Sequence, residues 1–386
     1  MNFIYELIGV PLGYLMSLIY NIVPNYAIAI IIFTLVTKLL LFPMNYKTQK
    51  NAARMQLLQP KLQKLQKSFS NNPARLQEEQ QKLYQEEGLN PMGSCLPAFI
   101  QMFLLFGVID VVYKPIKHIL RLSKDVRMAA VEKASELAMQ FKDVNGGKAI
   151  EANNLRHELL TMEVFDKHSS EFSHIGESFS ALVSEFSENF TIFGANLGKT
   201  PTLHPEVWDK EAIILCAIPF LAGISQLLVS FYSMIHQKKT NPTPQAGGGC
   251  MNVMMLLMPI MSIWIAFEVP AGIGFYWIWS SLFSFLVTLG LNCYFTHDRV
   301  VAMNEKEKEK ARIYAEKHPE KKTFMQKMLE QQAALDAQNG GSTVNSGEKK
   351  SRSEQNKANR DAINDARRRM AEKYGDLYEE SKDSEN

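Results

Sequence analysis

Cysteine is scarce in this chain, and the few cysteines follow no functional spacing. The 386 residues include four, Cys95, Cys216, Cys250 and Cys293, all in or beside apolar segments. They form no CxxC motif and no Cys/His spacing typical of a metal site. We therefore expect small buried apolar side chains at these positions, without disulfide bonds. The N-terminal residues also lack the basic region and cleavage site of a secretory signal.

Catalytic motifs of membrane enzymes are missing as well. The apolar segments contain no nucleophile with an adjacent base, no paired aspartates and no HExxH motif. His157, His168 and His174 lack metal-ligand spacing with nearby carboxylates. These absences argue against an intramembrane protease, and we expect neither a cofactor nor an enzymatic activity.

Charged residues are almost absent from several long apolar runs and dense between them. The chain is 46% hydrophobic and 21% charged, with a net charge of +2. The runs are long enough to cross the roughly 30 Å hydrocarbon core of a bilayer. We predict an all-α polytopic membrane protein with five spanning helices, near 24–43, 95–113, 211–235, 252–269 and 271–295.

The positions of lysine and arginine predict the orientation. No basic residue precedes Lys38, whereas basic residues follow the first span closely, Lys238 and Lys239 follow the third, and Arg299 follows the fifth. Basic loops stay in the cytoplasm, so we expect the N-terminus outside and the C-terminus inside. Residues 1–22 are amphipathic with Glu6 as their single charge, which predicts an interfacial helix. A sixth span is the alternative.

Within 23–120, the first and second spans are separated by a predicted cytoplasmic helical hairpin at about 45–88. An amphipathic helix is indicated by apolar residues at steps of three and four, namely Met55, Leu58, Leu62, Leu65 and Phe69. Asn71–Pro73 predicts the turn, and a second helix over Arg75–Glu87 ends at Gly88. A hairpin that merely connects two spans remains an open alternative.

Three further regions complete the predicted organisation. Residues 121–210 form an extracytoplasmic insertion, with helices expected near 124–142, 154–168 and 170–190, interpreted as a cap or lid. Residues 211–297 contain the third to fifth spans. Residues 298–386 form a charged, partly disordered cytoplasmic tail with a Gly/Ser/Asn linker at 339–347.

Lys38 lies inside the apolar run from Tyr26 to Phe42. A charge at membrane depth is costly and normally faces protein or water, so it marks a functional site. Thr34 and Thr37 share its helical face and extend a polar stripe. Because Pro43 is only about 7 Å further along the helix, a lysine that snorkels to the headgroups is the alternative.

Several stretches carry a pattern of a known family: Pro43 followed by Met55–Lys64, then Tyr84, Gly88–Pro97, Ile100–Met102 and Val269–Trp277. In this order, over roughly 1–120 and 190–297, they resemble the bacterial YidC insertase family, relatives of the mitochondrial Oxa and chloroplast Alb insertases. The chain is similar to the shorter form without the large first periplasmic domain. It departs from the family at Lys38, where arginine is usual, and at Phe103, where proline is common.

The resemblance implies a groove open to the cytoplasm, lined by polar groups around one positive charge. The expected lining is Lys38, Thr34, Gln101, Ser225, Gln226, Trp279 and the Ser280–Ser281 pair. For the glutamines and serines, ordinary hydrogen bonding between helices is the alternative. Trp279 could equally be an interface anchor.

The resemblance also implies a function and partners. We expect an insertase or chaperone for newly made proteins of the bacterial plasma membrane, acting on nascent membrane proteins in the lipid bilayer. The ribosome is an expected partner, through Lys47, Lys50, Arg54, Lys61 and Lys64 of the hairpin; signal recognition components and the Sec translocon are further candidates. We expect deletion of 124–190 to leave insertion largely intact. A secondary transporter or channel is the alternative function, although no repeated halves are present.

Overall fold

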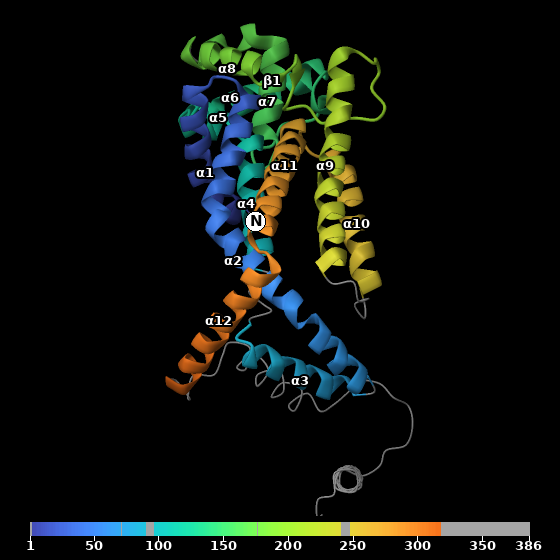
Figure 1. The fold of residues 1–386 in the computed structure, drawn as a ribbon. Helices are drawn as coiled ribbons and strands as arrows, with labels where there is room; N and C mark the ends of the chain where they lie inside the picture. The colour runs from blue at the N-terminus through green and yellow to red at the C-terminus, as the bar shows by residue number, and fades with distance from the viewer. Residues whose placement is uncertain (1, 71, 90–95, 176, 241–247, 318–386) are drawn as a thin grey trace, which may run out of the picture. The chain divides into compact units, whose positions relative to one another are not determined.

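A computed structural model describes residues 2–70, 72–89, 96–175, 177–240 and 248–317 (Figure 1). Three helices in these ranges are long and apolar enough to cross a membrane: α2 (Tyr26–Ser68), α9 (Lys210–Thr240) and α11 (Ala271–Tyr294). Shorter apolar stretches lie in α1 (Asn2–Ile22), α4 (Leu96–Tyr113) and α10 (Gly248–Ala266). The all-α polytopic membrane protein is thus confirmed, while the count of five spans stays a prediction.

The helix that contains Lys38 does not end at Pro43. α2 continues through Pro43 and Pro60 to Ser68, a length of 43 residues. Its first turn is capped by Asn25, whose side-chain oxygen accepts a hydrogen bond from the backbone nitrogen of Ile28 (3.1 Å). A proline inside a helix removes one backbone hydrogen bond, and the remaining bonds keep the segment helical. The first arm of the hairpin is therefore a direct extension of the first apolar helix.

The second arm of the hairpin is α3 (Pro73–Glu86). Asn72 caps it by accepting a hydrogen bond from the backbone nitrogen of Arg75 (3.1 Å). The chain leaves the helix through Gly88, whose φ of +60° is readily adopted by glycine. The two arms enclose a small apolar core of Leu58, Leu62 and Leu89, with Met55, Leu83 and Tyr84 packed against it.

Helix α1 packs lengthwise against α4 and also contacts α2 (Figure 1). It buries Met16, Ile19 and Tyr20, and the hydroxyl of buried Ser17 donates a hydrogen bond to the carbonyl of Ile119 (3.1 Å). This side of α1 is covered by protein. Its location at the membrane interface stays a prediction.

The insertion is mostly helical and ends in a short antiparallel hairpin. After α5 (Pro115–His118), which precedes it, the insertion contains α6 (Lys124–Phe141), η2 (Asn145–Gly147), α7 (His157–His168), η3 (Ser169–Ile175), α8 (Glu177–Asn189), β1 (Thr191–Ile192) and β2 (Ala195–Asn196). The predicted Gly-Gly turn lies in η2, where Gly146 has a φ of +60°.

Aromatic side chains join this insertion to the apolar helices in one continuous core. The ring of Tyr26, at the start of α2, lies 5.8 Å from that of Phe186 and 4.4 Å from that of Phe190, measured between centroids. Tyr20 of α1 lies 5.3 Å from Phe186. Removing 124–190 would delete both phenylalanine rings and expose the buried rings of Tyr20 and Tyr26. The structure therefore gives a physical reason to expect that such a deletion destabilises the core, so its effect on activity would not report on a lid alone.

The remaining helices form a second part of the same bundle. α9 packs against α10 and α11, and α11 packs against α2. The backbone nitrogens of Ala271 and Gly272, in the first turn of α11, donate to the carbonyls of Lys199 (2.9 Å) and Leu197 (2.8 Å). After α11, helix α12 (His297–Lys317) contacts α2 and α3. The predicted linker at 339–347 and the rest of the tail lie outside the described residues.

We predict that Phe186→Ala destabilises the whole bundle, because the ring is buried between α1 and α2. Truncating a buried phenylalanine costs roughly 3–5 kcal/mol of unfolding free energy. Thermal unfolding in detergent should show a clearly lower transition. The control is Phe193→Ala at the tip of the β-hairpin, where the ring is 78% exposed and should contribute little. Equal transitions for the two variants would show that α8 does not support the bundle.

Candidate functional site

Lys38 of α2 is buried against α11. It is 7% exposed, and its ammonium group donates a hydrogen bond to the hydroxyl of Ser284 at 2.9 Å. Within the described ranges no acidic side chain forms an ion pair with it. Contact with a neighbouring helix favours a lysine that faces protein over one that snorkels to the headgroups. A neutral hydroxyl leaves the positive charge uncompensated.

The two predicted polar neighbours on α2 do not bind the ammonium group. The Thr34 hydroxyl donates to the carbonyl of Ile30 (2.6 Å), and the Thr37 hydroxyl donates to the carbonyl of Thr34 (2.8 Å). Each therefore satisfies its own polar group inside its helix. Two turns beyond the apolar run, the amide of Gln49 donates to the side-chain oxygen of Asn292, which adds a second polar link between α2 and α11.

Helix α11, which Lys38 contacts, contains residues that the sequence identified and one that it missed. Ser280 is buried, and Ser281 and Trp279 are half-buried. The indole nitrogen of Trp279 is buried without a hydrogen-bond partner among the described residues, and its ring packs at 5.7 Å from that of Phe283. Ser284 was missed. Its position three and four residues after the serine pair was the available signal, because such residues share a helical face.

The other predicted lining residues lie on α4 and α9. Gln101 is half-buried on α4 and lies near the hydroxyl of Tyr276 on α11. On α9, the hydroxyl of buried Ser225 donates to the carbonyl of Ala222 (2.8 Å), and Gln226 is half-buried. The structure therefore brings Lys38 together with the serine face of α11. A single groove that joins all the lining residues stays a prediction.

The predicted basic surface of the hairpin is partly occupied by α12. Arg54 is buried, and its guanidinium donates to the backbone carbonyl of Glu87 (2.8 Å) and to the side chain of Asn304 on α12 (2.9 Å). One turn earlier on α2, Lys50 pairs with Glu307 at 2.9 Å. Lys50 and Arg54 therefore serve contacts within the chain.

Glu87 is the centre of this contact, and sequence reasoning did not find it. It is 3% exposed, and its carboxylate receives hydrogen bonds from Lys61 (2.7 Å), Asn304 (3.2 Å) and Lys308 (3.3 Å). Burial alone would raise the pKa of Glu87, but these three donors outweigh burial and hold the pKa below its usual range. The ionised carboxylate thus joins α2, the end of α3 and α12.

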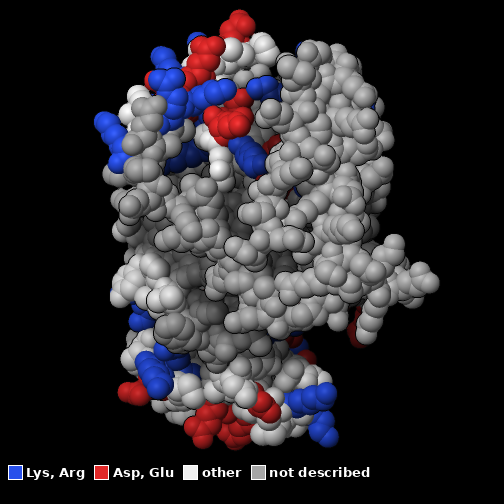
Figure 2. Space-filling model, turned by 90° about the horizontal axis from the view of Figure 1, so that it is seen from below, with Lys and Arg blue, Asp and Glu red and all other residues white. Residues whose placement is uncertain are grey.

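The remaining predicted hairpin residues are at the surface. Lys47 and Lys64 are exposed, and the side chain of Lys61 is 57% exposed even though it pairs with Glu87. Figure 2 views the protein from the end at which α3 and α12 are drawn. Where described atoms are visible, basic and acidic side chains are mixed on this face. No extended surface of one sign is visible there.

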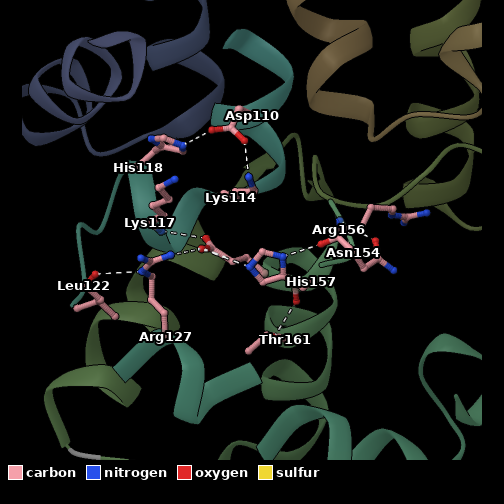
Figure 3. Close-up of polar contacts among 11 residues, drawn as sticks. Asp110, Lys114, Lys117, His118, Leu122, Arg127, Asn154, Arg156, His157 and Thr161 are labelled. Carbon is pink, nitrogen blue, oxygen red and sulfur yellow. Dashed lines mark hydrogen bonds and ion pairs between the residues drawn. The ribbon is translucent and has the colours of Figure 1, made fainter. Parts of the chain in front are cut away.

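A second polar network lies at the junction of α4 and the insertion (Figure 3). The buried carboxylate of Asp110 lies 2.5 Å from the ammonium nitrogen of Lys114 and 2.7 Å from the Nε2 atom of His118. On α1, Gly9 lies against Asp110 and Gly13 against His118, so closely that an added Cβ atom would clash with these side chains. The two glycines therefore allow α1 to cover the ion pairs.

Glu158 extends this network into α7. It is fully buried, and its carboxylate accepts from the backbone nitrogen of Lys117 (2.9 Å) and from Arg127 of α6 (3.2 Å), both of which are labelled in Figure 3. Burial raises the pKa of Glu158, although these donors act in the opposite direction. The contacts tie α5, α6 and α7 together. Sequence reasoning missed Glu158, since nothing in its local pattern distinguishes it from a surface glutamate.

Comparison with known proteins gives one family. The profile of the 60Kd inner membrane protein family matches residues 18–298. Three relatives, each named membrane protein insertase YidC, illustrate the similarity. The protein of Clostridium tetani is 41% identical over 107 residues, which are 28% of this chain and 49% of the relative. That of Clostridium perfringens is 43% identical over 97 residues, 25% of this chain and 41% of the relative.

The third relative matches over a longer stretch. The protein of Granulibacter bethesdensis is 26% identical over 275 residues, which cover 71% of this chain and 36% of the relative. The chain therefore spans about half, or less, of the length of each curated relative it matches.

We predict that Glu87→Gln loosens the contact between α12 and the hairpin. The amide keeps the shape of the side chain but removes the charge that binds Lys61 and Lys308. A hydrogen bond to a charged group contributes roughly 1.5–3 kcal/mol, so amide hydrogen exchange should become faster in α12 and in the hairpin arm of α2. The control is Glu78→Gln, which removes an exposed pair with Lys82 on α3. Similar exchange in both variants would contradict the proposed role of Glu87.

The wild-type contact should also depend on pH. The pKa of Glu87 in the folded protein lies below the ordinary value of a glutamate carboxyl, so its stabilisation is present above that ordinary value and is lost as pH falls through the lower folded value. Acidification should therefore lower the protection of α12 amides in the wild type, when each measured rate is divided by the intrinsic exchange rate at the same pH. The loss of protection should be smaller in Glu87→Gln, where, of the carboxylates Glu87 and Glu307, only Glu307, paired with Lys50, still titrates.

Proposed function

Because the chain belongs to the 60Kd inner membrane protein family, whose matched relatives are named YidC insertases, we propose that it is itself a membrane protein insertase. The observation that carries this proposal is the buried ammonium group of Lys38, held against α11 by the neutral hydroxyl of Ser284. The proposed substrates are newly made membrane proteins, received from the lipid bilayer and the cytoplasm.

The proposed action of Lys38 is electrostatic and non-covalent. An unpaired charge in a poorly hydrated bundle attracts opposite charge more strongly than it would in water. Acidic residues in the hydrophilic tail of an incoming protein would therefore be stabilised part of the way through the membrane. The half-buried Gln101 and Gln226 and the serines of α11 would supply hydrogen bonds to the same tail. Both interactions would lower the free energy needed to move the tail across the apolar layer.

The route out of the groove is proposed to run along α9, α10 and α11. Large apolar side chains on α9 and α10 are exposed in the structure, among them Ile224, Phe231, Met258 and Trp264. A bilayer is the natural environment for such surfaces. An apolar substrate helix could leave between them into lipid without exposing its side chains to water.

The hairpin is proposed to act on the cytoplasmic side, with the N-terminus of the chain outside and the C-terminus inside. Lys47 and Lys64 are exposed and available to phosphates of ribosomal RNA, and Lys61 is exposed as well although it pairs with Glu87. Lys50 and Arg54 are held by α12 and Glu87, so we assign them to positioning the hairpin. Signal recognition components and the Sec translocon are further proposed partners at this face, in the bacterial plasma membrane.

A secondary transporter or channel is the competing function. The structure favours the insertase, because the polar groups around Lys38 include hydroxyls bound within their own helices and no acidic partner that could take up a coupling ion in the described ranges. Purified protein in liposomes distinguishes the two functions. Robust flux of ions or small solutes would favour the transporter or channel.

The decisive test replaces Lys38 in a bacterium depleted of its own insertase. Wild type and Lys38→Arg should restore growth and insertion, because both keep a positive charge. Lys38→Leu should fail at equal protein abundance. Rescue by all three would show that insertion does not need the charge of Lys38, as expected for a lysine that snorkels to the headgroups. Failure of the wild type in a matched host would favour the transporter.

A further prediction concerns the partner of Lys38. Ser284→Asp places a carboxylate next to the ammonium group and should reduce the rate of insertion about tenfold or more, since an ion pair at this distance is worth a few kcal/mol even at moderate screening. Ser284→Ala keeps the charge free and should retain most activity. The measurement is protease protection of a translocated tail in proteoliposomes. Equal rates for the two variants would show that compensating the charge does not matter.

A further inference from the structure

The insertion forms most of a half-open cavity that the proposed action of Lys38 does not use. Its volume is about 820 Å³, within the range of ligand sites. One wall is α7, a second is the C-terminal half of α8 with Ser184 and Ser187, and a third is the segment Asn196–Thr200. Glu211, in the first turn of α9, completes it.

The cavity adjoins the ends of two helices that we assign to the groove. Glu211 of α9 accepts a hydrogen bond from the backbone nitrogen of Asn196 (3.0 Å) and pairs with Lys199 at 2.6 Å. The carbonyl of Lys199 in turn accepts from the backbone nitrogen of Ala271, in the first turn of α11 (2.9 Å). The same wall segment is therefore bonded to both α9 and α11. A polypeptide passing between these helices would emerge beside the cavity.

Two buried polar atoms of the lining have no hydrogen-bond partner among the described residues: the guanidinium Nε of Arg156 and the hydroxyl of Thr200. The arginine nitrogen is only a donor. Buried donors of this kind are normally paired. A ligand that brings acceptor oxygens into the cavity would satisfy them.

The charges of the lining exclude the simplest ligands. Four carboxylates face the cavity, from Glu163, Asp166, Glu188 and Glu211, together with three cationic side chains, from Arg156, Lys167 and Lys199. A small anion would meet several carboxylates. Among the described residues, no group of three or more His, Cys, Asp or Glu side chains could hold a metal ion. The lining instead suits a ligand that offers donors, acceptors and both signs of charge.

We propose that this cavity binds a short hydrophilic segment of the incoming polypeptide after that segment has crossed the membrane. A peptide supplies carbonyl acceptors for Arg156 and Thr200 and amide donors for the carboxylates. Binding on the outer side would hold the translocated segment and oppose its return. This inference rests on the proposed insertase function, and it assigns to the insertion a role in substrate retention.

The test uses the full-length protein in proteoliposomes and a single-span model protein whose hydrophilic N-terminal tail crosses the bilayer. A photo-crosslinking amino acid is placed at position 184, in the cavity wall, or at position 132 on α6, which is exposed and outside the lining. We expect the tail to crosslink at least fivefold more from position 184 than from 132. Added free peptide of the tail sequence should compete with this crosslink.

Two variants refine the test. Thr200→Val removes the hydroxyl while keeping the shape of the side chain, and should reduce the crosslink from position 184 severalfold. The matched control is Thr202→Val, two residues away, exposed and outside the lining, which should leave it unchanged. If Thr200→Val does not fold, the comparison of positions 184 and 132 in the otherwise wild-type chain still decides the outcome.

Protease protection of the tail, measured in the same samples, separates this inference from the proposed function. A protected tail that does not crosslink from position 184 overturns the inference and leaves the insertase function standing. Crosslinking of the apolar span instead of the tail also overturns it. A tail that is never protected shows that the insertase function itself fails, and the inference fails with it.

Discussion

Polar groups among apolar helices need partners inside the protein, and this requirement organises the described part of the chain. The ammonium group of Lys38 meets it with one neutral hydroxyl, from Ser284. The carboxylate of Glu87 meets it with three donors from α2 and α12, and Asp110 meets it with Lys114 and His118. The two carboxylates are neutralised and fix helices together. Lys38 alone among these groups keeps a net charge, which is what an electrostatic role in insertion requires.

The sequence predicted features that depend on local pattern. Lys38 was found because a charge interrupts an apolar run, and the hairpin because its apolar residues recur at helical steps and Gly88 follows it. The family was found from short motifs in and after the first span, at the start of the second and before the fifth, and the 60Kd inner membrane protein profile bears the family out. These signals lie within one helix or one turn, so they can be read without knowing the fold.

The contacts that sequence reasoning missed depend on distant residues. Glu87 binds Asn304 and Lys308, more than two hundred positions away, and Glu158 accepts from Lys117, which lies 41 positions away. The continuity of α2 was missed for a different reason. Pro43 normally indicates a helix end. A single missing hydrogen bond does not end α2, however, because the helix also packs against α11 and α12. The insertion was interpreted as a separate lid because nothing in its sequence shows that Phe186 and Phe190 pack on Tyr26.

The uninterrupted α2 has a mechanical consequence. From Lys38 to Ser68 the helix rises about 45 Å, at 1.5 Å per residue, so the buried charge and the hairpin lie on one continuous rod. A tilt of about 10° at the level of Lys38 would sweep the hairpin through roughly 8 Å by this geometry. Pro43 and Pro60 mark the places where such a rod bends most easily. A large partner that grips the hairpin could thereby exert torque on the helix and shift the ammonium group relative to the serine face of α11.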